Sequence, residues 1–320
     1  MVYTDSMKPE ETDVLCIGTA LIDSIIRGFD PEPVSASGYR AVSGSLHVGG
    51  EAVNEATALA KLGTRSSILC RLGTDEAGDL ILHQLQEAGI STALVQRSAH
   101  PTPVTTMFVN DDGTRKSITN QAHFLPFHPE AFLDDSLHPK AIILGSLFRA
   151  PFADPAVTEA VIRFAHERKI PVYADTKLPN VRACTLEEIR SVLPFVTCIT
   201  PNEDEARFYT GKDTPEETAE GFLQYGVQSV IIKLGDKGCY YRDAEMSVRL
   251  PAYPIEAVDA TGAGDNFLAG FVSELLRGST VEDALRFANA CGAICTTAAG
   301  ASAAMKSREQ VQAFLKKQEP

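Results

Sequence analysis

Short, continuously apolar runs alternate along the chain with longer segments whose apolar residues recur every three or four positions. Runs rich in β-branched residues are typical of strands buried on both faces of a parallel sheet. Such runs lie at 13–18, 66–71, 141–145, 170–175, 195–200 and 229–235. The helical spacing predicts helices within 51–63, 79–89, 155–169, 185–193 and 214–226. This order predicts an α/β fold, with an open, mostly parallel sheet and helices on both faces.

Two regions depart from this rhythm. Residues at about 19–47 and 101–120 alternate apolar and polar positions around turn signals such as the sequence DDG at 111–113. We expect these regions to form a small antiparallel β-sheet that acts as a lid. Since no repeat or linker interrupts the chain, residues 1–320 are predicted to form a single domain with this lid.

Charge and cysteine content narrow the class of protein. The 29 Lys and Arg residues against 42 Asp and Glu give a net charge of −13, which argues against a nucleic-acid partner. No apolar run approaches the roughly 20 residues that a membrane span needs, and no signal peptide is visible. The 7 cysteines include no C-x-x-C pair. We therefore expect buried free thiols and a cytoplasmic protein without a membrane partner.

The sequence VDATGAGD at 258–265 places a glycine-rich turn directly before an amphipathic helix. Backbone N–H groups at a helix N-terminus lack intrahelical partners, so Gly262, Ala263 and Gly264 predict an anion site that a phosphate can approach closely. Asp265 follows at once, and its ionised carboxylate can accept a proton. On this evidence alone, Asp265 fits equally a helix cap and a base for phosphoryl transfer.

The wider context favours the second interpretation. The sequence VDATGAGDNFLAGF resembles the signature of the ribokinase-like (PfkB) carbohydrate kinases. Three further segments are similar to motifs of that family, in the same order: VGGEAVNEATALAKLG at 48–63, TPNEDEA at 200–206 and IIKLGDKGCYY at 231–241. The resemblance covers roughly residues 13–315. It implies a ribokinase-like fold and ATP-dependent phosphorylation of a hydroxyl on a sugar or sugar derivative.

The resemblance also implies roles for the glycine-rich turn. Asp265 would be the general base that takes the proton from the acceptor hydroxyl. The backbone amides of Gly262, Ala263 and Gly264 would stabilise charge on the γ-phosphoryl group.

The sugar is expected to bind near the glycine-glycine motif. By resemblance, Asp23 and Asn54 bind sugar hydroxyls, and Gly49 and Gly50 precede the helix that carries Asn54. Asp175 and Lys177 lie at the carboxyl end of a predicted strand, where α/β sheets bind ligands, so we expect Asp175 or Lys177 to contact the substrate or a phosphate. An exposed surface pair fits the sequence equally, and we assign Lys177 to the substrate. Glu51 stands where ribokinase itself has lysine, which argues against ribose.

The remaining motifs are assigned to the nucleotide and to metal ions. The residues expected to contact ATP are Asn202, Lys233, Gly235, Gly238 and Asn289. Glu205 is expected to bind Mg²⁺ through water, although Asn202 and Glu205 also have the spacing of a helix capping box. Asp259 and Thr261 match positions where relatives hold a monovalent cation such as K⁺.

Other functions stay open at this stage. A nucleoside kinase of the same superfamily is one alternative. A sugar-acid kinase is another, with Lys177, Arg149 or Arg115 pairing with a carboxylate. A catalytically idle sugar or nucleotide sensor is the third, and the intact GAGD sequence argues against it. Relatives also suggest a homodimer formed through the lid.

Overall fold

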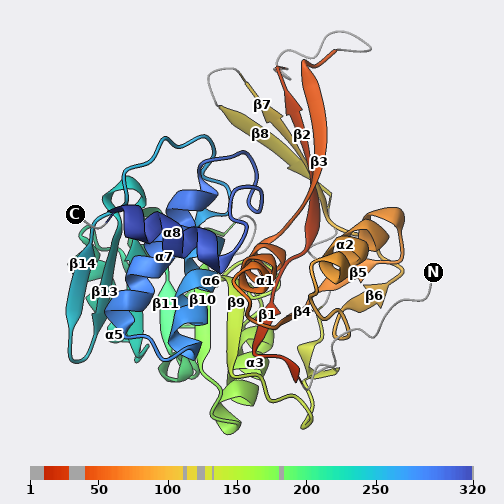
Figure 1. Cartoon of the computed structure of the whole chain (residues 1–320). Coiled ribbons are helices and arrows are strands. Elements are labelled where there is room, and N and C mark those ends of the chain that lie inside the picture. Colours follow the sequence, from red (N-terminus) through yellow and green to blue (C-terminus); the bar gives the residue numbers. More distant parts are fainter. Residues whose placement is uncertain are drawn as a thin grey trace.

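The computed structural model describes residues 11–28, 40–110, 114–120, 127–131, 133–179 and 184–318, and its centre is an eight-stranded sheet (Figure 1). The strand order is β14 (Ser247–Leu250), β13 (Cys239–Asp243), β12 (Ser229–Lys233), β11 (Cys198–Thr200), β10 (Val172–Thr176), β9 (Ala141–Leu147), β1 (Val14–Ile17) and β4 (Ser66–Leu69). The strands from β12 to β4 pair in parallel, and β13 and β14 extend one edge in antiparallel fashion. The predicted parallel sheet is therefore confirmed.

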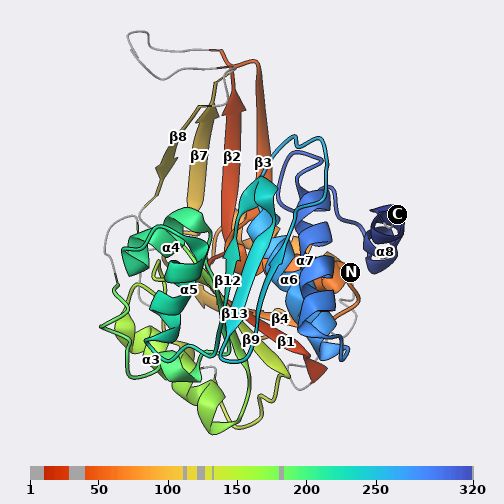
Figure 2. The ribbon, with the colours of Figure 1, turned by 90° about the vertical axis from the view of Figure 1, so that its left-hand side faces the viewer.

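Helices cover both faces of this sheet (Figures 1 and 2). One face carries α1 (Glu51–Lys61), α6 (Ala263–Leu276), α7 (Val281–Cys295) and α8 (Arg308–Gln318), and the other α3 (Pro155–Glu167), α4 (Glu203–Thr210) and α5 (Pro215–Leu223). In β1, Val14 and Cys16 pack into the core of the first face, whereas Leu15 and Ile17 pack into the core of the second. Because side chains alternate along a strand, a strand buried on both faces must be apolar at every position.

A second sheet projects from one end of the molecule (Figure 1). Its strands lie in the order β3 (Ser43–Gly49), β2 (Leu21–Arg27), β7 (Val104–Val109) and β8 (Arg115–Thr119), and we call it the lid sheet. The two outer pairs are antiparallel and the central pair β2–β7 is parallel. All four strands fall within the two predicted inserts or at their margin. Residues 29–39 and 111–113 of those inserts lie outside the described residues.

One predicted helix is wrong. Residues 185–192 form turns and lead into a short 3₁₀ helix, η4 (Leu193–Phe195). Most hydrogen bonds of this segment span three residues, as from Val192 N to Ile189 O and from Phe195 N to Val192 O. Pro194 restricts only the end of this segment, since proline lacks an N–H donor and disfavours α-helical geometry in the preceding Leu193.

The structure adds one two-stranded sheet that the sequence pattern did not reveal, beside the helix predicted within 79–89. Helix α2 (Glu76–Glu87) lies near the β4 edge with the two-stranded sheet of β5 (Arg71–Gly73) and β6 (Gln96–Ser98) (Figure 1). All 7 cysteines are buried and free. Within the described ranges, no helix is long and apolar enough to cross a membrane.

Candidate active site

The glycine-rich turn forms the N-terminus of α6, as the sequence predicts. Gly262 is the residue before the helix and has φ 75°, in the left-handed region. A Cβ atom at this position would lie 2.3 Å from the Ala301 Cβ, so no larger residue fits. Asp265 lies in the first turn of α6, with only 4% of its surface exposed. The turn therefore places backbone amides and one buried carboxylate together, and of these amides the Ala263 N–H already donates to Ala260 O at 3.2 Å.

A cavity of about 560 Å³ opens beside this turn. Its volume lies within the range typical of small-molecule sites. It is lined by Lys177, assigned to the substrate, by Glu205, assigned to Mg²⁺, and by all the residues that the sequence assigned to catalysis and to the nucleotide: Asn202, Lys233, Gly235, Gly238, Gly262, Ala263, Gly264, Asp265 and Asn289. The sequence analysis missed the apolar wall formed by Tyr253, Pro254 and Ile255, because that segment has neither helical nor strand periodicity.

The Asp265 carboxylate is held by Asn54 of α1. The Asn54 side-chain amide donates a hydrogen bond of 2.6 Å to Asp265 Oδ2. Burial raises the pKa of Asp265 to about 6, opposed by Lys177 and by the Asn54 hydrogen bond and assisted by the charges of Glu51 and Asp175. A carboxylate with this pKa is ionised at neutral pH and is a better proton acceptor than an exposed aspartate. The amide of Asn54, expected to bind sugar, thus contacts the candidate base.

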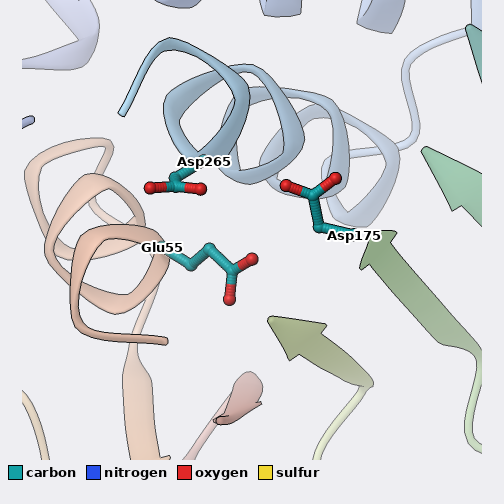
Figure 3. Close-up of side chains that lie close together, drawn as sticks. All are labelled: Glu55, Asp175 and Asp265. Carbon is teal, nitrogen blue, oxygen red and sulfur yellow. The ribbon is translucent and has the colours of Figure 1, made fainter. Parts of the chain in front are cut away.

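Two further carboxylates lie close to Asp265. Figure 3 shows Glu55 from α1 and Asp175 from β10 directed toward the same space as Asp265. One oxygen from each residue lies within 4.8 Å of the others. Neither oxygen of Glu55, nor Asp175 Oδ2, has a hydrogen-bond partner in the part of the chain that the structure describes. Burial raises the pKa of Glu55 well above its ordinary range, with further contributions from the charges of Asp265 and Asp175.

The charge of Asp175 on β10 is balanced by Lys233 on β12, which lies beyond β11 in the sheet. Lys233 Nζ lies 2.5 Å from Asp175 Oδ1, and Thr200 Oγ1 donates to the same oxygen at 3.1 Å. Because β10 and β12 end at the same edge of the sheet, residues that are 58 positions apart meet beside the cavity. Unlike Asp175, which the sequence analysis left as a surface or substrate contact, Glu55 was missed altogether. Its position among the buried residues Ala52, Ala56 and Leu59 of α1 was the available signal.

Glu205 combines two of the expected properties. It forms a capping box with Asn202 at the start of α4: the Asn202 side chain accepts from the Glu205 N–H, and the Glu205 side chain accepts from the Asn202 N–H. Glu205 Oε2 also accepts from Thr176 Oγ1 at 2.8 Å, and the residue lines the cavity. Asp175 Oδ2 has no hydrogen-bond partner among the described residues, and the charge of Asp175 acts on Glu205. Carboxylate oxygens of this kind suit Mg²⁺, which prefers oxygen ligands and retains water.

A separate, smaller hollow lies between the lid sheet and β9. Its volume is about 50 Å³, and Glu51, Thr105 and Ser146 are among its lining residues. Asp23 lies on β2 beside Gly49, where a Cβ atom would come within 2.5 Å of Asp23 Oδ2. Burial, and then the charge of Glu51, raises the pKa of Asp23 to about 6.

The two compartments meet at an ion pair. Lys177 Nζ lies 3.8 Å from Glu51 Oε1, and Thr19 Oγ1 donates to the other Glu51 oxygen. Glu51 lines the small hollow and Lys177 lines the large cavity. Gly50 allows this geometry at the start of α1, since it has φ 102° and a Cβ atom there would lie 2.5 Å from Thr19 O.

Asp259 and Thr261 lie in the loop before α6. Asp259 Oδ1 accepts from the Thr261 N–H at 3.0 Å and from Thr261 Oγ1 at 2.7 Å. Asp259 Oδ2 accepts from the Gly300 N–H at 3.0 Å. These bonds brace the loop that carries the glycine-rich turn, and the monovalent cation stays a prediction.

Comparison with known proteins agrees with this architecture. The model of the pfkB family of carbohydrate kinases matches residues 11–308. A ribokinase of Bacillus subtilis is 27% identical over 95% of this chain and 99% of its own length. The Arabidopsis thaliana protein named Probable fructokinase-5 is 29% identical, over 95% of this chain and 97% of its own length.

Among solved structures, the Arabidopsis thaliana ribokinase complexed with ribose and ATP matches with a TM-score of 0.82 at 24% identity. The match covers 95% of this chain and 99% of that one, which shows the ribokinase-like fold. Since the family model spans nearly the whole sequence, the chain belongs to the PfkB family of carbohydrate kinases.

Proposed function

We propose that this kinase transfers the γ-phosphoryl group of Mg·ATP to a hydroxyl of a sugar or sugar derivative, with Asp265 as the general base. The observation that carries this proposal is the placement of Asp265. Its buried carboxylate lies in the first turn of α6, next to the amides of Gly262, Ala263 and Gly264, in the cavity of about 560 Å³. Phosphoryl transfer needs this combination of an anion site and an adjacent proton acceptor.

The chain's own groups account for each requirement of the reaction. The amides at the start of α6 face the phosphoryl group, where they stabilise the negative charge that develops on its oxygens. Asp265, held by Asn54, orients the acceptor hydroxyl and takes its proton as the new O–P bond forms. Lys177 and Lys233 line the same cavity and add positive charge.

Magnesium completes the charge balance of the site. Mg²⁺ bound to the phosphates neutralises part of their charge during transfer. Glu205, which lines the cavity, would hold it through water. Glu55 and Asp175, which have carboxylate oxygens without partners among the described residues, each have an oxygen within 4.8 Å of one on Asp265. Asn202, Gly235, Gly238 and Asn289 would contact the nucleotide, whose base would pack on the apolar wall at Tyr253.

The lid sheet has a role in the same proposal. By closing over the acceptor, it would exclude water and so prevent hydrolysis of ATP. Leu46 and Ile118 are apolar lid residues with 65% and 68% of their surface exposed, which favours a homodimer formed through the lid. We also propose a cytoplasmic location, which is supported by the free buried cysteines, and one kinase domain for the whole chain.

The proposal is tested by ADP release with Mg·ATP across hexoses, pentoses, sugar acids, sugar phosphates and nucleosides. We expect one sugar class to stimulate ADP release, and Asp265→Asn to abolish that stimulation. Stimulation by nucleosides alone would favour a nucleoside kinase. ATP binding without turnover of any acceptor would favour the sensor and contradict the proposed function.

A further inference from the structure

The chain leaves β9 through a strained turn that points to a ligand site. Ser146 has φ 81° and Phe148 has φ 75°, although neither is glycine. Non-glycine residues in this region cost roughly 1–3 kcal/mol each and cluster at functional sites. The pairing of β9 with β10 also changes register here, between Ala174 and Thr176. The turn places Ser146 and Arg149 together on the lining of the small hollow.

The hollow is large enough for one small functional group of a ligand but too small for a whole sugar. Its volume of about 50 Å³ holds a few water-sized atoms. Thr105, Thr119 and Ser146 line it beside Arg149, and the hydroxyls of the two threonines lie 3.0 Å apart and share a hydrogen bond. Ser146 has 0% of its surface exposed, and its Oγ has no hydrogen-bond partner among the described residues. A buried hydroxyl without a partner is costly unless a ligand or water satisfies it.

Among the described residues around the hollow, Arg149 is the cation that has no ion-pair partner. Lys177 pairs with Glu51, and Lys233 pairs with Asp175. The Arg149 guanidinium has no hydrogen bond or ion pair with the described part of the chain, although its charge contributes to the lowered pKa of Glu51. Glu51 already has Lys177 and Thr19 as partners. A half-buried guanidinium beside an unpaired hydroxyl donor is suited to a planar oxyanion, which it can bind through two parallel hydrogen bonds.

Of the three basic residues that could recognise an acidic sugar, the structure favours Arg149. Lys177 is engaged with Glu51. Arg115 begins β8, whereas Thr119 at the other end of that strand lines the hollow. Four residues of β-strand separate these positions by about 13 Å.

We propose that this hollow binds an oxyanion group of the acceptor, so that the substrate is an anionic sugar derivative, either a sugar acid or a sugar phosphate. The inference rests on the proposed kinase function. The acceptor would lie across the Glu51–Lys177 pair, with its reacting hydroxyl at Asp265 and its carboxylate or phosphate at Arg149 and Ser146. Asp23 on the lid sheet would bind hydroxyls between the two ends.

The test uses matched acceptors that share a carbon skeleton: a neutral aldose, its aldonate and its terminal phosphate. We expect kcat/KM for one anionic member to exceed that of the neutral sugar by at least tenfold. Arg149→Gln should raise KM for that anion by about 10- to 100-fold, with a smaller effect on the neutral sugar. Arg149→Lys keeps the charge without the planar fork, and should give an intermediate KM. Preference for the aldonate identifies a carboxylate, and preference for the phosphate identifies a phosphoryl group.

Two controls keep the outcomes distinct. Arg163→Gln, on the exposed side of α3, should leave all kinetic constants unchanged, and thermal unfolding checks that each variant is folded. Equal or better turnover of neutral sugars, with selectivity unaffected by Arg149→Gln, would overturn the anion site and leave the kinase function intact. If no acceptor is turned over, calorimetric titration of the same panel with an unreactive ATP analogue decides: failure of every anion to bind overturns the anion site.

Discussion

The contact between Asn54 and Asp265 makes a quantitative prediction about pH. The Asn54 amide donates to Asp265 Oδ2 at 2.6 Å inside the protein. A hydrogen bond to a charged group contributes roughly 1.5–3 kcal/mol, and one pKa unit corresponds to about 1.36 kcal/mol. Asn54→Ala removes a group that favours the ionised form. The pKa of Asp265 should therefore rise from about 6 by about one to two units.

The consequence is a displaced acid limb in the pH–rate profile. At pH 7 the ionised fraction of Asp265 should fall from about nine-tenths to between about one-half and one-tenth. The value of kcat/KM at pH 7 should thus fall by about two- to tenfold and recover toward wild type near pH 9. The assay measures kcat/KM from pH 5 to pH 9 for wild type and Asn54→Ala.

A matched variant and a distinct outcome sharpen this test. Asn289→Ala removes another buried asparagine that lines the cavity, and it should leave the acid limb in place because Asn289 bonds to Pro251 O and Cys239. If Asn54 instead acts only on the sugar, as the family resemblance implies, Asn54→Ala will raise KM by the same factor at every pH. A loss that does not vary with pH would refute the effect of Asn54 on the pKa of Asp265.

Three other variants test the electrostatics of the site. Lys233→Met should lower the free energy of unfolding, measured in urea, by about 3–5 kcal/mol, because it leaves the buried Asp175 carboxylate without its partner. Adding Asp175→Asn should restore most of this loss. A change in the free energy of unfolding below about 1 kcal/mol would contradict the ion pair. Glu205→Gln keeps an oxygen for the capping box, so the free energy of unfolding should change by less than about 1 kcal/mol. The Mg²⁺ concentration that gives the half-maximal rate should rise. If that concentration is unchanged, Glu205 has only the capping role. Asp265→Asn should stabilise the protein by up to about 3 kcal/mol at pH 8, because folding raises the Asp265 pKa from 3.8 to about 6. In wild type, the buried charge lowers the free energy of unfolding increasingly as pH rises through that range. If the difference in stability between the variant and wild type is the same at pH 5 and pH 8, this effect is absent.

The fold was predictable because its dominant signal is local. Continuous apolar runs identified each parallel strand of the central sheet, since such strands are buried on both faces. The helix predicted at 185–193 is wrong although the apolar spacing there is helical, and Pro194 restricts only the end of that segment. Sequence pattern also predicted no strand order, since that depends on which strands the helices connect in space.

The site was predictable only where its chemistry lies within one segment. The glycine-rich turn and Asp265 are adjacent in sequence, and the capping box of α4 spans three residues. In contrast, Asn54 and Asp265 are 211 residues apart, so their hydrogen bond depends on the packing of α1 against α6. Glu55 and Arg149 have no local motif. Only the folded structure singles them out: neither Glu55 oxygen has a hydrogen-bond partner among the described residues, and Arg149 lines the small hollow.

The most direct test of the proposed mechanism is single-turnover phosphoryl transfer by Asp265→Asn in the presence of Mg·ATP and the best acceptor. A general base contributes about 10²- to 10⁴-fold to rate. We predict that the variant folds, binds ATP within about threefold of wild type, and transfers the phosphoryl group at least about 100-fold more slowly. A folded variant that transfers at close to the wild-type rate would show that Asp265 is not the base.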